Sequence, residues 1–154
     1  MRNLSPAKHL AAFLAKYDAP VATIARGALA RMRKRLPGMF ELVYDNYNAL
    51  AIGFSPSEKP SQAVFSIALY PRWVSLFFLN GARLADPAGL LKGNGKKVRH
   101  IVLTGAADIQ KPEVEALLSS ALEIAGVRVG PLRRGVLVIR SVSARQRPRR
   151  PTSA

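Results

Sequence analysis

Residues 40–80 constrain the fold most strongly, because they contain four strand-like runs with no room for a helix between them. The first two runs flank the turn-prone cluster "DNYN". The third, "AVFSIALY" (63–70), has the alternating pattern of a strand. The fourth, "RWVSLFFL" (72–79), follows Pro71 closely enough for a hairpin. Parallel strands need a crossover of a dozen or more residues, so these runs predict an antiparallel sheet.

Helical patterns flank these strands. In residues 5–17, Ser5 is a suitable N-cap and Pro6 suits the first helical position. Apolar residues at helical spacing predict two more helices, over residues 21–36 and 111–126, and a short one at 87–91. Further strands are expected at 100–105 and 135–143. The order predicts an α+β fold, a two-layer sandwich with an antiparallel sheet of about five or six strands and helices on one face.

The chain carries a large positive charge. Lys and Arg number 24 against 9 Asp and Glu, which gives a net charge of +15. After Glu123 there are eight arginines and no acidic residue. The last stretch, "ARQRPRRPTSA", is poor in apolar residues, basic and proline-containing, which is typical of disorder. We therefore expect one domain over residues 1–142 and a disordered basic tail over residues 143–154.

One functional hypothesis is non-specific, salt-sensitive binding of nucleic acid or another polyanion. It rests on the basic stretch "RMRKR" of the second predicted helix and on the tail. The alternative interpretation of "RMRKR" is an ordinary helix face exposed to solvent. The sequence has no helix-turn-helix, zinc-finger or RNP signature. The candidate polyanion-binding residues are Arg31, Arg33, Lys34, Arg35, Arg145, Arg147, Arg149 and Arg150.

The hypothesis that ranks first is a pocket that binds a small ligand, an anion or a protein partner. Tyr and Trp side chains fall at strand ends and turns, where they can line a pocket or pack in the core. The glycine turn in "LLKGNGKKVRH" is no P-loop, because Leu90 replaces the first glycine and Lys97 the hydroxyl residue. It is either an anion nest or a solvated turn. The candidate ligand-binding residues are Tyr44, Asp45, Asn46, Tyr70, Trp73, Lys96 and Arg99.

The residue types argue against an enzyme or a metalloprotein. Cysteine is absent, which removes disulfides and thiolate ligands and fits a reducing compartment. The two histidines, His9 and His100, lack triad or metal-ligand spacing. The carboxylates are scattered, and no apolar run approaches the roughly 18 residues of a membrane span. We therefore expect a cytoplasmic protein without catalytic residues, metal ligands or a cofactor, and without a membrane partner.

The segment "LADPAGLLKGNGKKVRHI", with the strand pair before it, resembles the YdhG-like family of small bacterial domains of largely unknown function. The resemblance covers roughly residues 22–125. It implies a frataxin-like fold of helices over an antiparallel sheet. It also implies a role in iron delivery, in which surface carboxylates would carry the metal. This chain departs from that pattern, because the region of its first two predicted helices has one acid, Asp18, which lies between them. Iron delivery therefore ranks below the ligand-binding and polyanion-binding hypotheses.

Overall fold

The computed structural model describes residues 4–130 and 135–152. The helices are α1 (Pro6–Leu14), α2 (Ala19–Arg35) and α3 (Pro112–Ala125). The strands are β1 (Phe40–Asp45), β2 (Leu50–Ser55), β3 (Phe65–Leu69), β4 (Val74–Phe78), β5 (Arg99–Leu103) and β6 (Val136–Val142). Short 3-10 turns are η1 (Pro60–Gln62), η2 (Gly81–Arg83) and η3 (Ala106–Gln110). The predicted short helix at 87–91 is absent from this part of the structure; instead the Asp86 carboxylate accepts hydrogen bonds from the amides of Leu90 and Leu91.

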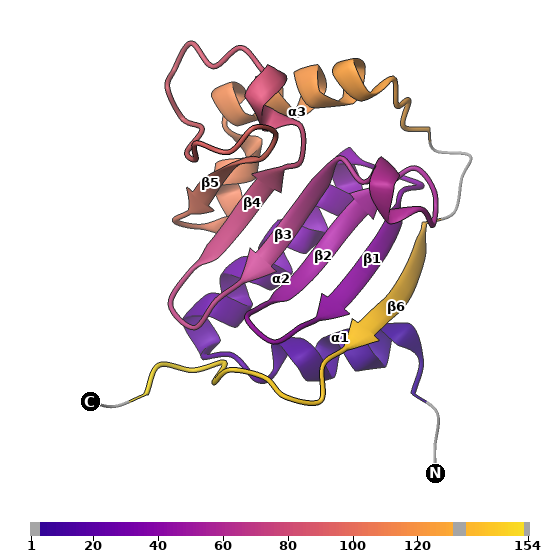
Figure 1. The fold of residues 1–154 in the computed structure, drawn as a ribbon, viewed down its shortest axis with the longest axis vertical. Coiled ribbons are helices and arrows are strands. Elements are labelled where there is room, and N and C mark those ends of the chain that lie inside the picture. The colour runs from indigo at the N-terminus through magenta and orange to yellow at the C-terminus, as the bar shows by residue number, and fades with distance from the viewer. Residues whose placement is uncertain (1–3, 131–134, 153–154) are drawn as a thin grey trace.

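The six strands form one sheet in the order β5-β4-β3-β2-β1-β6 (Figure 1). The first five pair antiparallel with their neighbours, as the short connections predict. The prediction of a purely antiparallel sheet is wrong, because β6 pairs parallel with β1. Between β5 and β6 lie η3 and α3, and a connection of this length can carry the chain across to the far edge in the parallel direction.

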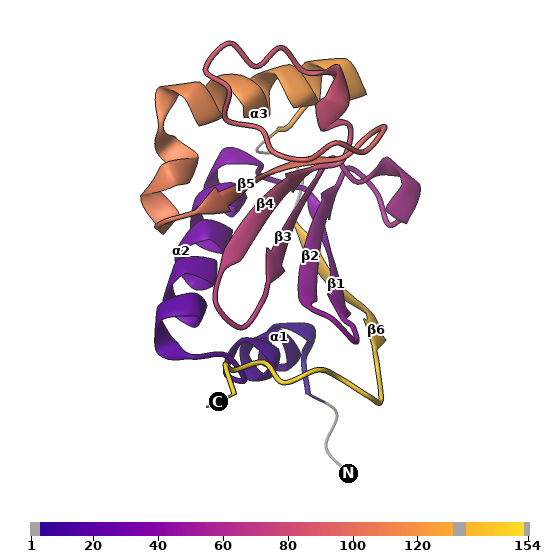
Figure 2. The same ribbon diagram turned by 60° about the vertical axis from the view of Figure 1, so that its left-hand side comes forward.

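One face of the sheet packs against the helices. Its centre consists of Ile52, Ile67 and Leu76, which are paired in register and fully buried. They belong to one hydrophobic core with the apolar stripe of α2. Figure 2 shows α2 running along this face, with α1 at the lower end and α3 at the upper end. Within the described residues, no helix has both the length and the apolarity to cross a membrane.

The ends of α1 and α2 are tied to the lower end of the sheet by Tyr17. Its side chain is 2% exposed. Its hydroxyl donates to the carbonyl of Leu69 and accepts from the amide of Leu50, both at 3.1 Å. Burial raises the pKa of Tyr17, so the phenol stays protonated and keeps its donor role.

Residues 143–152 differ from the disordered tail that their composition predicts. They run along the lower end of the sheet, beneath the turns that join β1 to β2 and β3 to β4 (Figure 1). The amide of Ser143 donates to the carbonyl of Asp45, and that of Arg147 to the carbonyl of Tyr47, both at 2.8 Å. Arg149 is only 6% exposed. This segment, called the C-terminal strap below, therefore belongs to the folded domain.

Candidate functional site

Three segments distant in sequence meet at the lower end of the sheet and form a cleft of about 590 Å³. They are the β1–β2 turn, the β3–β4 hairpin turn and the C-terminal strap. The hairpin turn is closed by a hydrogen bond from the amide of Tyr70 to the carbonyl of Trp73 at 2.9 Å. The cleft, called the aromatic-arginine cleft below, is lined by Asn48, Tyr70, Pro71, Arg72, Trp73, Arg147, Pro148, Arg150, Pro151 and Thr152.

The aromatic wall of the cleft is a stacked pair. The rings of Tyr70 and Trp73 lie 4.7 Å apart between centroids at an interplanar angle of 17°. Trp73 is still 42% exposed, so much of the indole faces solvent. Tyr47, beside the cleft on the β1–β2 turn, is 49% exposed, with the guanidinium of Arg147 5.9 Å from its ring centre. A flat apolar group can stack on such a surface without rearranging the core.

Three arginines also line the cleft. Arg150 is 60% exposed at its side chain, lies 3.4 Å from the carboxylate of Asp18 and donates to the carbonyl of Lys16. Arg72, on the hairpin turn, makes no hydrogen bond or ion pair with any residue in 4–130 or 135–152. Arg147 contributes a third guanidinium. Exposed ion pairs are weak, so all three arginines can turn toward an anionic ligand at little cost.

The strap is held in place by a buried ion pair. Asp45, at the end of β1, is fully buried, and its two carboxylate oxygens accept from Lys16 at 2.8 Å and Arg149 at 2.9 Å. Arg149 also donates to the carbonyls of Asn46 and Tyr47. Its guanidinium lies 5.9 Å from the ring centre of Tyr17. The pair therefore fixes the strap, and with it one wall of the cleft.

The charge state of Asp45 follows from these contacts. Burial alone raises the pKa of a carboxyl group. Here the hydrogen bonds from Lys16 and Arg149 outweigh burial and hold the pKa of Asp45 below its ordinary value. Asp45 is therefore ionised at neutral pH, and both of its oxygens are already occupied. This arrangement suits a structural anchor and not a general acid or base.

The structure brings together only part of the predicted ligand-binding set. Tyr70 and Trp73 line the cleft and Asp45 anchors its wall. Asn46 lies beside it and accepts a hydrogen bond from Ser141. Tyr44 pairs with Ala51 one position before Asp45, on the opposite face of the sheet.

Lys96 and Arg99 lie at the other end of the molecule. Arg99 pairs with Phe78 at the far end of β4, whereas Trp73 immediately precedes Val74 at the near end. Five residues of extended strand separate the two positions, a span of roughly 17 Å. The guanidinium of Arg99 donates to the carbonyls of Gly95 and Val98 in its own loop. The glycine turn is therefore not part of the aromatic-arginine cleft.

The predicted polyanion-binding set also divides. Three arginines of "RMRKR" have partners on neighbouring elements: Arg31 binds Gln110, Arg33 binds Glu41 through two hydrogen bonds, and Arg35 binds Glu115. Lys34 is exposed. The "RMRKR" residues lie at the C-terminal end of α2, whereas the strap contacts Asp18 at the N-terminal end of this helix. The two basic segments therefore lie at opposite ends of α2.

Within the strap, the four predicted arginines have three different positions. Arg147 and Arg150 line the cleft, Arg149 is buried against Asp45, and Arg145 is exposed outside the cleft. The sequence interpretation missed Arg72 and Asn48 as cleft residues. The stretch "YPRW" offers one signal for Arg72, because a turn that places Tyr70 beside Trp73 also exposes the arginine between them.

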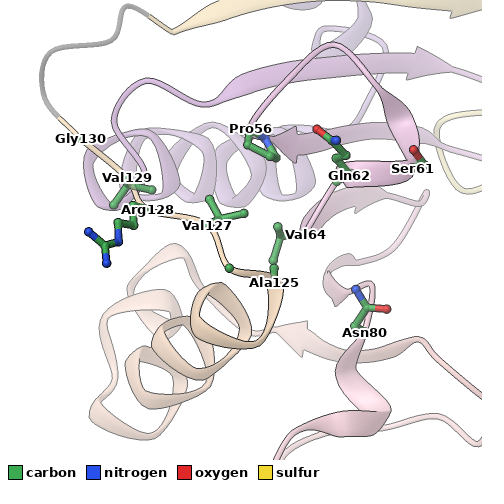
Figure 3. A pocket seen from close by; sticks show the side chains of 12 residues that line it. Pro56, Ser61, Gln62, Val64, Asn80, Ala125, Val127, Arg128, Val129 and Gly130 are labelled. Carbon is green, nitrogen blue, oxygen red and sulfur yellow. The ribbon is translucent and has the colours of Figure 1, made fainter.

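A larger cleft, of about 880 Å³, lies at the opposite end between η1 and the end of α3. Small and apolar side chains supply most of its lining, including Ala63, Val64 and Val127. Arg128 is the one charged residue in the part of this lining that lies within residues 4–130 and 135–152, and Figure 3 shows it extending away from Ser61 and Gln62. Arg128 therefore does not converge with these polar side chains, and the smaller cleft is the better candidate.

Among residues 4–130 and 135–152, His, Asp and Glu side chains form no group of three that could hold a metal ion. Comparison with known proteins leaves the family of the chain open: no family model, curated protein or solved structure matches it.

Proposed function

We propose that the protein is a non-enzymatic binding module whose aromatic-arginine cleft binds single-stranded nucleic acid. The observation that carries the proposal is the convergence of the exposed Trp73 with Arg72, Arg147 and Arg150 in one cleft. Proteins bind single strands by stacking bases on aromatic rings and by holding the phosphates with cationic side chains. The cleft supplies both kinds of group within one small volume.

The geometry favours a single strand over a duplex. A base pair inside a duplex has no free face, whereas the bases of a single strand can stack on an aromatic ring. The exposed indole of Trp73 offers such a surface. The three arginines lie on the hairpin turn and on the strap, so a phosphate on either side of a stacked base can meet a guanidinium.

A small phosphorylated ligand with a planar group is the second candidate for the same cleft. The cleft volume of about 590 Å³ lies in the range of small-molecule sites. The two candidates differ in their salt dependence, because a single phosphorylated ligand engages fewer arginines than a strand of several phosphates.

The YdhG-like resemblance, its frataxin-like architecture and a cytoplasmic location remain part of this proposal. The placement of α1 and α2 on one face of the sheet supports that architecture (Figure 2). We rank iron delivery last, because oxygen-ligated iron needs clustered negative charge. Asp45 is occupied by Lys16 and Arg149, and Asp108 accepts from Thr104 and Lys111.

Fluorescence anisotropy with a labelled oligothymidine tests the proposal. Three phosphate contacts predict a slope of about −2 for log affinity against log salt, so affinity should fall about 20-fold between 50 and 200 mM salt. Arg72→Ala should bring the slope to about −1.4. Arg83→Ala, an exposed arginine on η2 at the other end of the sheet, is the matched control and should leave it unchanged.

Two outcomes would contradict the proposal. The first is equal weakening by Arg72→Ala and Arg83→Ala, which would indicate binding by net charge alone. The second is an excess of duplex competing as well as an excess of single strand. A mononucleotide that displaces the oligothymidine at equal concentration would favour the small-ligand candidate.

A further inference from the structure

We propose that the outer edge of β6 binds an extended acidic peptide segment of a partner protein by adding a strand to the sheet. This surface is separate from the aromatic-arginine cleft. Figure 1 shows β6 as the outermost strand on the right of the sheet. Its one strand neighbour among the described residues is β1. Alternate amides and carbonyls on its outer side are therefore available to an incoming strand.

The side chains of β6 suit such pairing. The strand reads VLVIRSV, and its terminal residues Val136 and Val142 are 41% and 54% exposed. Long, apolar, exposed edges pair readily with other strands. The register against β1 shifts after Ile139, so that Arg140 has no partner in the ladder. The bulge interrupts the ladder between its first four pairs and the last two, Tyr44–Ser141 and Asp45–Val142, and an interrupted edge suits a short peptide rather than a second sheet.

A groove lies beside the same edge on the helical side of the sheet. It has a volume of about 220 Å³, and its lining consists of Ala7, Leu10, Ala11, Leu14, Arg26, Leu29, Arg33 and Leu137. Leu137 is the β6 residue that pairs with Glu41. A strand added next to β6 would direct alternate side chains toward this face, where an apolar one can enter the groove.

The positive charges around the edge favour an acidic partner. Arg26 and Arg140 are exposed and make no hydrogen bond or ion pair with any residue the structure describes. Arg33 is held by Glu41. A peptide that alternates apolar and acidic residues would direct its apolar side chains to the groove and its acidic ones to the other face, where Arg140 follows the core-packed Ile139. A second copy of the chain is a poorer occupant, because each copy carries a net charge of +15 and no acidic residue after Glu123.

The test uses a labelled eight-residue peptide of alternating valine and glutamate. We expect saturable binding in fluorescence polarisation and slowed hydrogen exchange at the β6 amides. Methylation of alternate peptide nitrogens should abolish binding, because it removes the donors that pair with the edge. A peptide of alternating valine and lysine should not bind.

Two exposed alanines of α1 provide a matched pair of variants. Ala11→Arg fills the groove and should weaken binding about tenfold or more. Ala12→Arg adds the same side chain outside the groove lining and should leave the affinity unchanged. Arg72→Ala, in the aromatic-arginine cleft, should also leave it unchanged, which separates this surface from the proposed nucleic-acid site.

Three results of the peptide assays would overturn the inference. They are no binding up to about 1 mM peptide, equal binding of the methylated peptide, and equal effects of Ala11→Arg and Ala12→Arg. A concentration-dependent dimer in sedimentation that Ala11→Arg abolishes would assign the edge to a second copy and also contradict the acidic partner.

Discussion

Replacing Arg149 by alanine should release the C-terminal strap and lower the stability of the whole domain. The side chain of Arg149 is 5% exposed, and that of its partner Asp45 is fully buried. Removing one member of a fully buried ion pair costs about 3–5 kcal/mol, since the other charge is left unpaired.

Two features reduce this cost. Asp45 keeps the hydrogen bond from Lys16 at 2.8 Å, so the carboxylate is not left without a partner. The Nε of Arg149 is buried without a hydrogen-bond partner in the described part of the chain, a penalty that the substitution removes. We therefore expect a loss of about 2–3 kcal/mol in the free energy of unfolding. For a chain of this length the loss corresponds to a fall in melting temperature of about 4–12 °C.

Thermal and urea unfolding measure this effect, with Arg145→Ala as the matched control in the same strap. Arg145 is exposed and lies outside the cleft lining, so its replacement should change the melting temperature little. Limited trypsin digestion of Arg149→Ala and of wild type provides a local measurement, because a released strap exposes the bond between Arg145 and Gln146. Equal melting temperatures for the two variants, together with equal cleavage rates for Arg149→Ala and wild type, would refute the anchoring role of Arg149.

Three further perturbations test the fold. Ionised Asp45 has a lowered pKa, so its contribution to stability is present at neutral pH and is lost as the pH falls below about 4. Asp45→Asn should thus be less stable than wild type at pH 7 yet lose less stability between about pH 5 and pH 2. Urea titrations at several pH values measure this difference, and parallel stability curves for the two proteins would contradict the stabilising role of ionised Asp45. Tyr17→Phe leaves the buried Leu69 carbonyl and Leu50 amide without their partner and should cost about 2 kcal/mol in chemical denaturation, whereas Tyr47→Phe, at an exposed position, should cost almost nothing. Gly27→Ala should destabilise the protein despite the higher helix propensity of alanine, because the new Cβ would lie 2.6 Å from that of Ala106 on η3; a higher melting temperature would show that η3 moves aside.

The helices and strands were largely predictable because their signals are local. Periodic apolar residues locate α1, α2 and α3, and Ser5 caps α1 as expected by accepting from the amide of Lys8. Gly126 ends α3 in the left-handed conformation that the sequence indicates. The direction of β6 was not predictable in this way, because it depends on how a long crossover packs and not on the strand itself.

The candidate site was only partly predictable, for a related reason. Tyr70 and Trp73 were identified because a hairpin turn brings near neighbours together. The strap was predicted to be disordered because its composition lacks apolar residues. Its order comes instead from contacts with the β1–β2 turn about a hundred residues earlier: the main-chain hydrogen bonds of Ser143 and Arg147 and the ion pair between Arg149 and Asp45. The burial of Asp45 has no local signal in "DNYN". Lys96 and Arg99 were grouped with Trp73 although a full strand length separates them.

The fluorescence of Trp73 tests the proposed function most directly, because it is the only tryptophan in the chain and lies in the cleft itself. A base that stacks on the indole should quench its emission. We predict saturable quenching by unlabelled oligothymidine at 50 mM salt, with the same midpoint as the anisotropy titration, and none by inorganic phosphate at equal phosphate concentration. Binding seen in anisotropy without any change in Trp73 emission would place the nucleic acid elsewhere on the protein and contradict the proposed role of the aromatic-arginine cleft.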